Sequence, residues 1–420
     1  MIARYTDYMY SYPHKTAYRP FARPVRLQPY LEALRGRTAS LYFHLPFCRS
    51  KCGYCNLFSI PAHRGEAIDR YLRALHRQAE QLAPLTSGLH FDSFAMGGGT
   101  PLLLEPEQLD VLFSLAGHFH AHPKDVFASI ETSPEYADPA RLEVLKRAGT
   151  TRISIGIQSF NDGELRALGR HPKGDSIYPA LERIRRTDFP VFNLDLIYGI
   201  EGQTPQSLLH SLKEAMRFAP DEMFIYPLYV RYGTGIKARE SDDACYRLYL
   251  TARDFLLQQG YRQTSMRRFV RHSLTAECSC GDEVMLSCGA GGRSYLGPLH
   301  YATPYAVHPS RIKEVIAGYD DTADFTTAAN GFLLSPDEQR RRYLIKNLLY
   351  HMGINKEEYR SRFQQDMEAE TLIGRLIDRQ WVEDTAGRIR LTIEGMGYSD
   401  YIGQLFISPE VRSLMRSYTY

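Results

Sequence analysis

The chain alternates apolar runs with amphipathic segments from residue 40 to about residue 260, and this alternation restricts its fold more than any other feature. Six apolar runs have the length and composition of buried strands: 41–45, 91–96, 126–131, 152–157, 191–198 and 222–229. Helical periodicity follows each of them, at 66–85, 106–117, 139–149, 174–187, 205–219 and 242–260. Strands that alternate with helices form a parallel sheet with right-handed crossovers. We therefore predict an α/β fold, a partial (β/α)6 TIM-like barrel, with its chemistry at the carboxyl ends of the strands.

The pattern divides the chain into four parts. Residues 1–38 are rich in Tyr, Pro and Arg without a steady period, and we interpret them as an irregular N-terminal arm. The barrel occupies 39–260. Residues 261–334 are rich in glycine and cysteine, with short apolar runs that indicate strands completing the core. Residues 335–420 contain two helical segments (335–353 and 359–380) followed by a hairpin within 381–402. We predict that they form a small α+β winged-helix-like domain with a structural or lid role.

Composition excludes several classes of protein. The 420 residues include 51 Lys and Arg against 48 Asp and Glu, a net charge of +3, so no nucleic-acid partner is expected. No apolar run approaches the roughly 20 residues that span a bilayer, and the N-terminal residues have no apolar core typical of a secretory signal. We expect a cytoplasmic protein with no membrane partner. Three of its seven cysteines fall within eight residues, which in a reducing compartment indicates a metal site.

Those three cysteines form the motif C-x3-C-x2-C: Cys48, Cys52 and Cys55 directly follow the first predicted strand. A tight loop of thiolates is typical of an iron–sulfur cluster. Structural zinc would need a fourth ligand, for which His44 and His63 are the nearby candidates. Three ligands on a 4Fe–4S cluster leave one iron open to the amino and carboxylate groups of S-adenosylmethionine (SAM). One electron from such a cluster cleaves SAM and yields a 5′-deoxyadenosyl radical.

The sequence resembles the coproporphyrinogen III dehydrogenase (HemN) and HemW branch of the radical SAM superfamily, from about Tyr42 to about Ile407. The motif CGYCNLFS is more similar to HemW, which also has a tyrosine before the third cysteine. HemN has a further cysteine two residues after the third, where this chain has Leu57. The resemblance implies a radical SAM barrel followed by a HemN-type C-terminal domain.

Further motifs lie at the ends of the predicted strands. The glycine run 97–101, GGGTP, follows the second strand, and its backbone amides could approach an anionic group. Glu131 ends the third strand; its carboxylate could accept hydrogen bonds from a ribose or an ammonium, or be only a charge at a helix N-terminus. The resemblance implies that the following residues contact SAM, with Tyr42 and Glu131 also taking part in catalysis: Tyr42, Tyr54, Gly98, Gly99, Thr100, Glu131, Gln158, Arg170 and Asp195. It also implies a possible second SAM.

Three further groups have alternative interpretations. Cys278, Cys280 and Cys288 could bind a second metal or supply a thiol for hydrogen transfer, or could be inert buried thiols. The basic run 267–272, with Arg262 and Arg293, could bind substrate carboxylates or be a solvated face. In the arm, Tyr10, Tyr12 and His14 could line a substrate pocket or pack for stability alone.

Three functions are compatible with these motifs. The first is a radical SAM oxidoreductase, similar to coproporphyrinogen III oxidase, that acts on a tetrapyrrole-like or other organic substrate. The second is a radical SAM methyltransferase or cyclopropanase that uses a second SAM, and the third is a non-catalytic HemW-like haem chaperone. Leu57 disfavours the decarboxylating oxidase, and the chain has no C-x-x-C-H haem-attachment motif. The partners expected are a small-molecule substrate and a reductase such as flavodoxin or ferredoxin.

Overall fold

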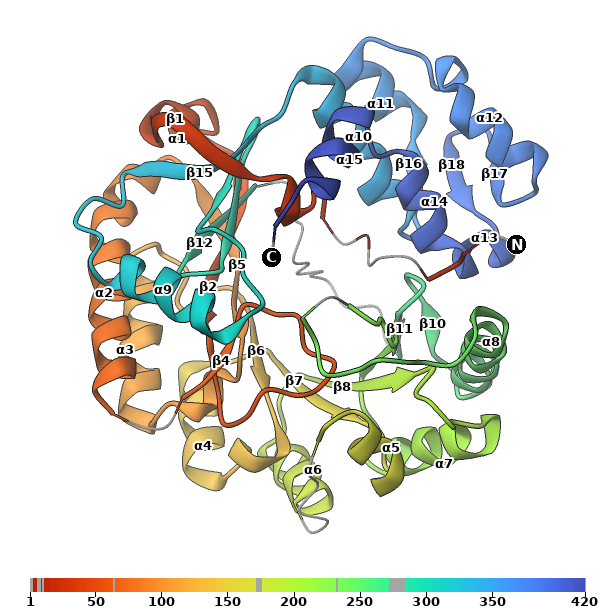
Figure 1. Ribbon diagram of the computed structural model, residues 1–420, viewed down its shortest axis with the longest axis horizontal. Helices are drawn as coiled ribbons and strands as arrows, with labels where there is room; N and C mark the ends of the chain where they lie inside the picture. Colours follow the sequence, from red (N-terminus) through yellow and green to blue (C-terminus); the bar gives the residue numbers. More distant parts are fainter. Residues whose placement is uncertain are drawn as a thin grey trace.

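A long, curved mixed sheet runs through the molecule (Figure 1). The computed structural model describes residues 3–5, 9, 11–62, 65–170, 176–231, 233–271 and 284–419. The sheet has the strand order β1-β15-β14-β13-β12-β2-β5-β6-β7-β8-β9-β11-β10. Within the described residues, no helix is long and apolar enough to cross a membrane.

Six neighbouring strands of this sheet are parallel, as the sequence predicted. They are β2 (Thr38–Leu45), β5 (His90–Gly98), β6 (Phe127–Thr132), β7 (Arg152–Gln158), β8 (Val191–Tyr198) and β9 (Glu222–Pro227). Their helices are α2 (Glu66–Leu82), α3 (Pro106–Gly117), α4 (Pro139–Ala148), α5 (Asp162–Ala167), α6 (Ile177–Thr187), α7 (Pro205–Met216) and α8 (Asp242–Gln258). In Figure 1 these helices cover the outer face of the curved sheet.

The sequence explains these elements locally. Strands β2 and β8 are buried along almost their whole length, as expected for parallel strands covered by helices. Helix α4 begins after Asp138, whose carboxylate accepts a hydrogen bond from the Arg141 amide, and ends at Gly149, which has a φ of 87°. Side-chain caps of this kind also begin α5, α7 and α8.

Further strands extend the sheet at both edges. Strand β12 (Val284–Cys288) is parallel to β2, and antiparallel strands follow it: β13 (Arg293–Leu296), β14 (Leu299–Ala302), β15 (Thr327–Leu333) and β1 (Arg19–Arg26). At the other edge lie β11 (Arg268–Val270) and β10 (Arg262–Gln263). Short elements complete this part: α1 (Gln28–Ala33), β3 (Phe47–Cys48), β4 (Ile60–Pro61), α9 (Pro309–Asp320), η1 (Lys15–Ala17), η2 (Ala83–Thr86), η3 (Pro101–Leu103) and η4 (Pro134–Tyr136).

The prediction of an irregular arm over residues 1–38 is wrong from Arg19 onward. Strand β1 and helix α1 lie within this range, and β1 pairs with β15 as the edge strand of the sheet. Two prolines, Pro20 and Pro24, hide this strand from pattern analysis, because proline is tolerated only where an amide donor is not required. An edge strand meets that condition.

The C-terminal region contains the predicted hairpin, formed by β17 (Val382–Asp384) and β18 (Arg388–Leu391), to which β16 (Ile354–Asn355) adds a third strand. The single helix predicted over 359–380 is wrong. The helix ends near Gln364, whose φ of 54° is left-handed, and a new one begins at Thr371. The helices here are α10 (Pro336–Leu348), α11 (Lys356–Phe363), η5 (Met367–Ala369), α12 (Thr371–Asp378), α13 (Ile393–Gly397), α14 (Ser399–Leu405) and α15 (Pro409–Arg416).

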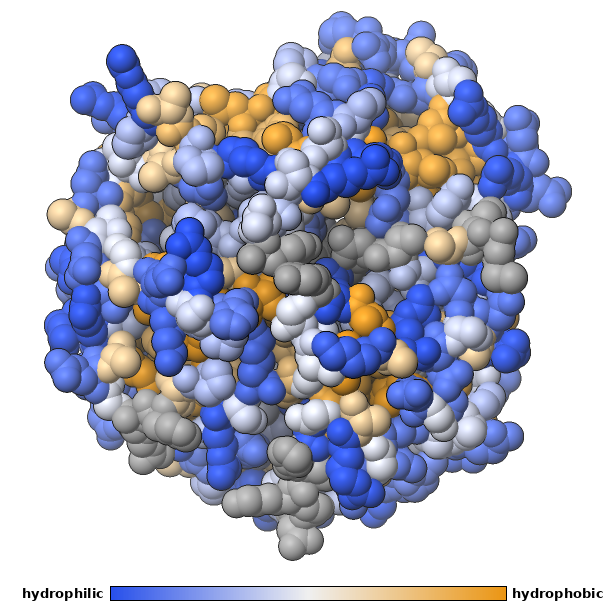
Figure 2. All heavy atoms as spheres, viewed as in Figure 1, coloured by the Kyte–Doolittle hydropathy of each residue, from blue (hydrophilic) through white to orange (hydrophobic). Residues whose placement is uncertain are grey.

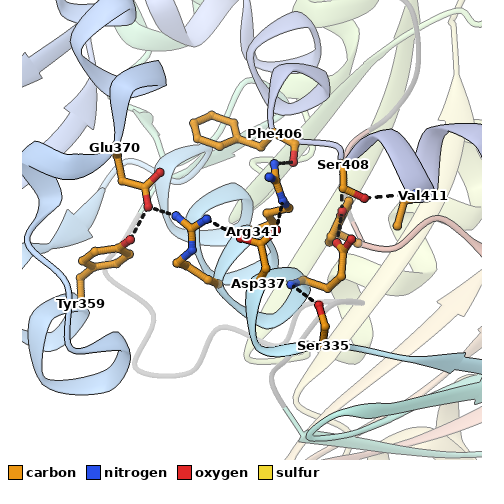
Figure 3. A network of polar contacts seen from close by, with 11 residues as sticks. Ser335, Asp337, Arg341, Tyr359, Glu370, Phe406, Ser408 and Val411 are labelled. Atoms are coloured by element: carbon orange, nitrogen blue, oxygen red, sulfur yellow. Dashed lines mark hydrogen bonds and ion pairs between the residues drawn. The ribbon is translucent and has the colours of Figure 1, made fainter.

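Polar contacts join these C-terminal helices (Figure 3). From α10, Arg341 donates to Asp337 at 2.7 Å and to the Phe406 carbonyl after α14 at 3.0 Å. Ser408 accepts from the Val411 amide at 3.1 Å and so begins α15. The N-terminal arm joins the same network, because the Tyr12 hydroxyl accepts from the Ser408 amide at 3.2 Å. The arm is thereby fixed to the C-terminal helices.

Candidate active site

A cavity of about 830 Å³ lies at the carboxyl ends of the parallel strands. Figure 2 shows patches of apolar side chains on this face, surrounded largely by polar residues. The cavity is lined by every residue that was expected to hold the cluster or contact SAM: Tyr42, Cys48, Cys52, Tyr54, Cys55, Gly98, Gly99, Thr100, Glu131, Gln158, Arg170 and Asp195. The fold therefore brings together side chains that are up to about 150 positions apart in the sequence.

The cysteine loop is fixed by two other loops. The Gly53 amide donates to the Leu168 carbonyl at 2.9 Å, and the Gly53 carbonyl accepts from the amides of Gly235 and Ile236 at 2.7 and 3.1 Å. A Cβ atom on Gly53 would lie 3.0 Å from the Leu168 carbonyl oxygen, so a glycine suits this close contact. The loop therefore has a set position relative to the ends of β7 and β9.

Cys48, Cys52 and Cys55 are free, half-buried thiols. Burial raises the pKa of Cys48 to about 11, and burial also raises the pKa of Cys55. The hydroxyls of Thr100 and Ser59 lie 3.8 Å from the Cys48 sulfur and 3.9 Å from the Cys55 sulfur, within reach as donors. The protein alone therefore favours the protonated thiols. Iron would favour the thiolates, because binding to a metal deprotonates thiol ligands. The three thiols therefore fit an iron–sulfur cluster.

The zinc alternative finds no support in the described residues, where no three His, Cys, Asp or Glu side chains converge closely enough to hold one metal ion. His44 is already engaged: its Nε2 lies 3.0 Å from the Phe58 carbonyl and its Nδ1 lies 3.1 Å from the Tyr42 hydroxyl. The other candidate, His63, lies outside the described residues. An iron–sulfur cluster does not need such convergence, because its thiolates bind separate iron atoms.

The surroundings of His44 determine its protonation state and which ring nitrogen carries the proton. Burial lowers the pKa of His44 to about 4, so the ring is neutral near pH 7. The Phe58 carbonyl can only accept, so Nε2 carries the proton and Nδ1 accepts from the Tyr42 hydroxyl. The Tyr42 side chain is thereby held at the cavity wall.

The glycine turn packs against the cysteine loop. The Gly99 amide donates to the Leu45 carbonyl and the Thr100 amide to the Phe47 carbonyl, both at 2.8 Å, while the Gly98 amide donates to Glu131 at 3.3 Å. The expectation that these amides approach an anionic ligand is therefore wrong, since protein groups occupy all three.

Two carboxylates face the cavity. Burial, with the nearby charge of Asp195, raises the pKa of Glu131 to about 7. Burial likewise raises the pKa of Asp195 to about 6, against the hydrogen bond that Asn193 donates at 2.7 Å. Glu131 lines the cavity wall, where one of its carboxylate oxygens accepts from the Gly98 amide at 3.3 Å and the group can still contact a ligand. Paired carboxylates with raised pKa values are typical of a functional site and suit a cationic group.

Gln158 and Arg170 shape the cavity between β7 and the cysteine loop. Gln158 has a φ of 73° at a bulge in the pairing of β7 with β8, which turns its side chain at the strand end. The Arg170 guanidinium donates to the carbonyls of Gly156 and Ile157 at 2.7 and 3.1 Å. Burial opposes its charge, but Tyr54 and Cys52 outweigh this and raise the pKa of Arg170. Arg170 therefore joins the end of β7 to the cysteine loop.

We expect the affinity for SAM to increase as the pH rises from 6 to 8. Above its pKa of about 7, Glu131 is a carboxylate that attracts the cationic cofactor, whereas below it the group is neutral. Replacing Glu131 by glutamine keeps the shape, removes the charge and should lower the affinity about ten- to a hundredfold. Equilibrium binding of SAM measured across this pH range checks both expectations. A Glu131→Gln variant that keeps the wild-type pH dependence would contradict the assignment.

Only some of the basic residues considered for binding substrate carboxylates lie at the cavity. Arg293 lines the cavity, but Arg262 lies on the exposed edge strand β10. Arg267 and Arg268 do not line the cavity and do not form a solvated face, because they are largely enclosed in ion pairs with Asp400 and Glu222, respectively. Of the other two basic residues of this run, Arg271 is exposed, with its Cζ atom 5.5 Å from the Tyr261 ring centroid, and His272 lies outside the described residues.

The structure decides between the alternatives for part of the arm and for one of the remaining cysteines. Tyr12 and His14 are buried and do not line the cavity; the neighbouring Lys15 does. Cys288 is a buried thiol on β12, and burial raises its pKa, as expected for an inert group. Tyr10, Cys278 and Cys280 lie outside the described residues.

Among the cavity residues that sequence reasoning missed are His44 as a partner of Tyr42, Lys15 and Arg231. His44 had a signal, because it is two residues from Tyr42 and side chains two apart share one face of a strand. Arg231 follows the sixth parallel strand, where the fold places its chemistry. No sequence feature could have identified Lys15 as a cavity residue, since its position depends on how the N-terminal arm packs.

Comparison with known proteins agrees with this geometry. The model of the radical SAM superfamily matches residues 42–215. The oxygen-independent coproporphyrinogen III oxidase of Escherichia coli is 28% identical over 382 residues, covering 84% of this chain and 82% of the relative. The haem chaperone HemW of Mycobacterium tuberculosis is 30% identical over 310 residues, covering 70% and 78%. The chain belongs to the HemN/HemW family of radical SAM proteins.

Both branches of the HemN/HemW family match over most of the chain. HemW of Bacillus subtilis is 25% identical over 375 residues, covering 85% of this chain and 96% of the relative. The structure of E. coli HemN, a coproporphyrinogen III oxidase, superposes with a TM-score of 0.79 at 25% identity and covers 94% of this chain and 96% of its own. This likeness supports the α/β fold with its parallel sheet, and membership of the family implies a 4Fe–4S cluster and SAM.

Proposed function

We propose that this protein cleaves SAM reductively at a 4Fe–4S cluster bound by Cys48, Cys52 and Cys55, and acts on a tetrapyrrole-like organic substrate. The observation that carries the proposal is one cavity in which the three thiols, the glycine turn and two carboxylates with raised pKa values meet. The cluster, when bound, supplies one electron that cleaves the sulfonium to methionine and a 5′-deoxyadenosyl radical, which abstracts hydrogen from the substrate.

The protein's own residues hold and orient the reactants. Glu131 attracts the cationic cofactor and would accept a hydrogen bond from its amino group, and Asp195 and Gln158 would accept or donate hydrogen bonds elsewhere in the cavity. Tyr42, held by His44, is a polar contact near the cysteines. Arg170 keeps the cysteine loop against β7. The enclosing walls exclude water and oxygen from the reacting groups.

The substrate class is proposed from the cavity and the relatives. Lys15, Arg231 and Arg293 bring positive charge to the cavity wall, which suits a substrate with carboxylates. Relatives in the HemN branch are named coproporphyrinogen III oxidases, and those in the other branch haem chaperones. Leu57, in place of the further cysteine of HemN, favours the chaperone as the second candidate. A methyltransferase or cyclopropanase with a second SAM is a third.

Three associated expectations complete the proposal. The electron donor is a reductase such as flavodoxin or ferredoxin, and the protein acts in the cytoplasm. The helices and hairpin of residues 335–420 resemble a winged-helix arrangement, to which we assign a structural or lid role rather than one in binding nucleic acid.

Analysis of the reaction products separates the candidates. We expect anaerobically reconstituted protein, reduced with dithionite, to convert SAM into 5′-deoxyadenosine, measured by liquid chromatography and mass spectrometry. Coproporphyrinogen III should increase this yield and lose carboxyl groups if the oxidase proposal is right. S-adenosylhomocysteine formed alongside would select the methyltransferase. Haem binding without any cleavage of SAM would reject the enzyme and select the chaperone.

A further inference from the structure

A buried ion pair links the C-terminal helices to the cavity. Asp400, on α14, accepts from the Arg267 guanidinium through both carboxylate oxygens, at 2.6 and 2.7 Å. Only 1% of the Asp400 side chain and 6% of the Arg267 side chain are exposed. Arg267 belongs to the barrel part, because its carbonyl accepts from the Ile225 amide of β9 at 2.9 Å. The pair therefore spans the junction of the two parts.

Tyr229 connects this pair to the cavity. It follows β9, lines the cavity wall, and its hydroxyl contacts both Asp400 and Arg267. Its ring lies near two guanidinium groups: the Arg231 Cζ atom is 4.9 Å from the ring centroid and the Arg267 Cζ atom is 5.9 Å from it. Arg231 lines the cavity as well. Contacts thus run from α14 through Tyr229 to a basic side chain in the cavity.

The burial of the Asp400–Arg267 ion pair restricts the position of Tyr229. A buried carboxylate and guanidinium hold each other strongly, since removing one partner leaves an uncompensated charge. A phenol hydroxyl in contact with both has little freedom to rotate, and its ring then offers a fixed face to the neighbouring arginine. The position of Arg231 accordingly depends on a residue of the C-terminal region.

We propose that Asp400 is a positioning residue of the substrate cavity: through Tyr229 it sets Arg231 where the carboxylate of an anionic substrate binds. The C-terminal region is then part of the substrate-binding apparatus rather than a separate module. The inference rests on the proposed function for its choice of ligand.

The test uses coproporphyrin III, a stable tetracarboxylate, as the probe in fluorescence titrations of the full-length protein. Asp400→Asn and Arg231→Gln should each weaken binding of the probe about tenfold, and the double variant should be no weaker than either alone, because both remove one interaction. Asp384→Asn is the matched control. Asp384 pairs with Lys356 on the surface of the same region, so binding should be unchanged.

A second measurement separates this inference from the proposed function. In hydrogen–deuterium exchange, Asp400→Asn should increase the exchange of backbone amides from Tyr226 to Arg231, and Tyr229→Phe should do so with the ion pair intact. Losses in probe affinity that simply add in the double variant would overturn the proposal. If the wild type does not bind the probe, the choice of substrate fails, and exchange unchanged in both variants would then overturn the positioning role.

Discussion

Protein with Cys52 replaced by alanine is expected to lose its iron–sulfur cluster and to form no 5′-deoxyadenosine. Cys52 lies in the loop that Gly53 fixes to Leu168 and Gly235, so no other thiol of the described residues can move into its place. A cluster with two protein thiolates would leave two irons open, and such a cluster is labile. Iron content, absorbance near 400 nm and product formation after anaerobic reconstitution measure the loss.

Cys245→Ala is the matched control for this variant. Cys245 is a buried free thiol on α8 that does not line the cavity. Its removal should leave the iron content and absorbance unchanged, at a small cost in stability. Equal loss of iron in the two variants would mean that the cluster depends on the general state of the cysteines rather than on the loop.

Replacement of Gly99 by alanine is expected to impair the cavity as severely, by displacing the cysteine loop. A Cβ atom at Gly99 would lie 2.3 Å from the Phe47 carbonyl oxygen, a backbone atom that cannot move without shifting the strand before Cys48. Overpacking of this kind costs about 1–3 kcal/mol or more. Urea denaturation of the protein measures the loss of stability, and iron content after reconstitution measures the displacement of the loop.

Gly318→Ala provides the comparison. Gly318 is inside helix α9, and a Cβ atom there would meet nothing within 4 Å. Alanine should therefore stabilise the protein by about 0.5–1 kcal/mol through its helix propensity. A Gly99→Ala variant that retains wild-type stability and iron content would show that the turn and the cysteine loop do not depend on each other.

Much of the barrel and its site could be predicted from the sequence because each depends on local pattern. The strand at 191–198 was predicted with its observed bounds, since it is an apolar run between a helix and a glycine. The parallel order then brings Cys48, Glu131 and Asp195 to one end of the sheet without knowledge of any contact. The motif of three cysteines supplied the chemistry.

What could not be predicted depends on contacts between distant parts of the chain. Strand β1 carries two prolines and is stabilised by β15, about 300 residues later. Arg267 belongs to a basic run in the sequence, yet its role follows from Asp400, 133 positions away. The amides of the glycine turn were expected to face a ligand, but the Glu131 carboxylate and the carbonyls of Leu45 and Phe47 accept hydrogen bonds from them. Tertiary packing determines such features, and the hydrophobic periodicity of the sequence carries no information about it.

Electron paramagnetic resonance of the reduced, reconstituted protein, recorded before and after addition of SAM, tests the central claim most directly. The claim is that three thiolates hold a four-iron cluster with one iron open to the cofactor. It predicts a reduced-cluster signal whose g-values shift when SAM binds, and no such signal when Cys48, Cys52 and Cys55 are all replaced by alanine. A cluster signal that SAM leaves unchanged, or that persists without these three cysteines, would contradict it.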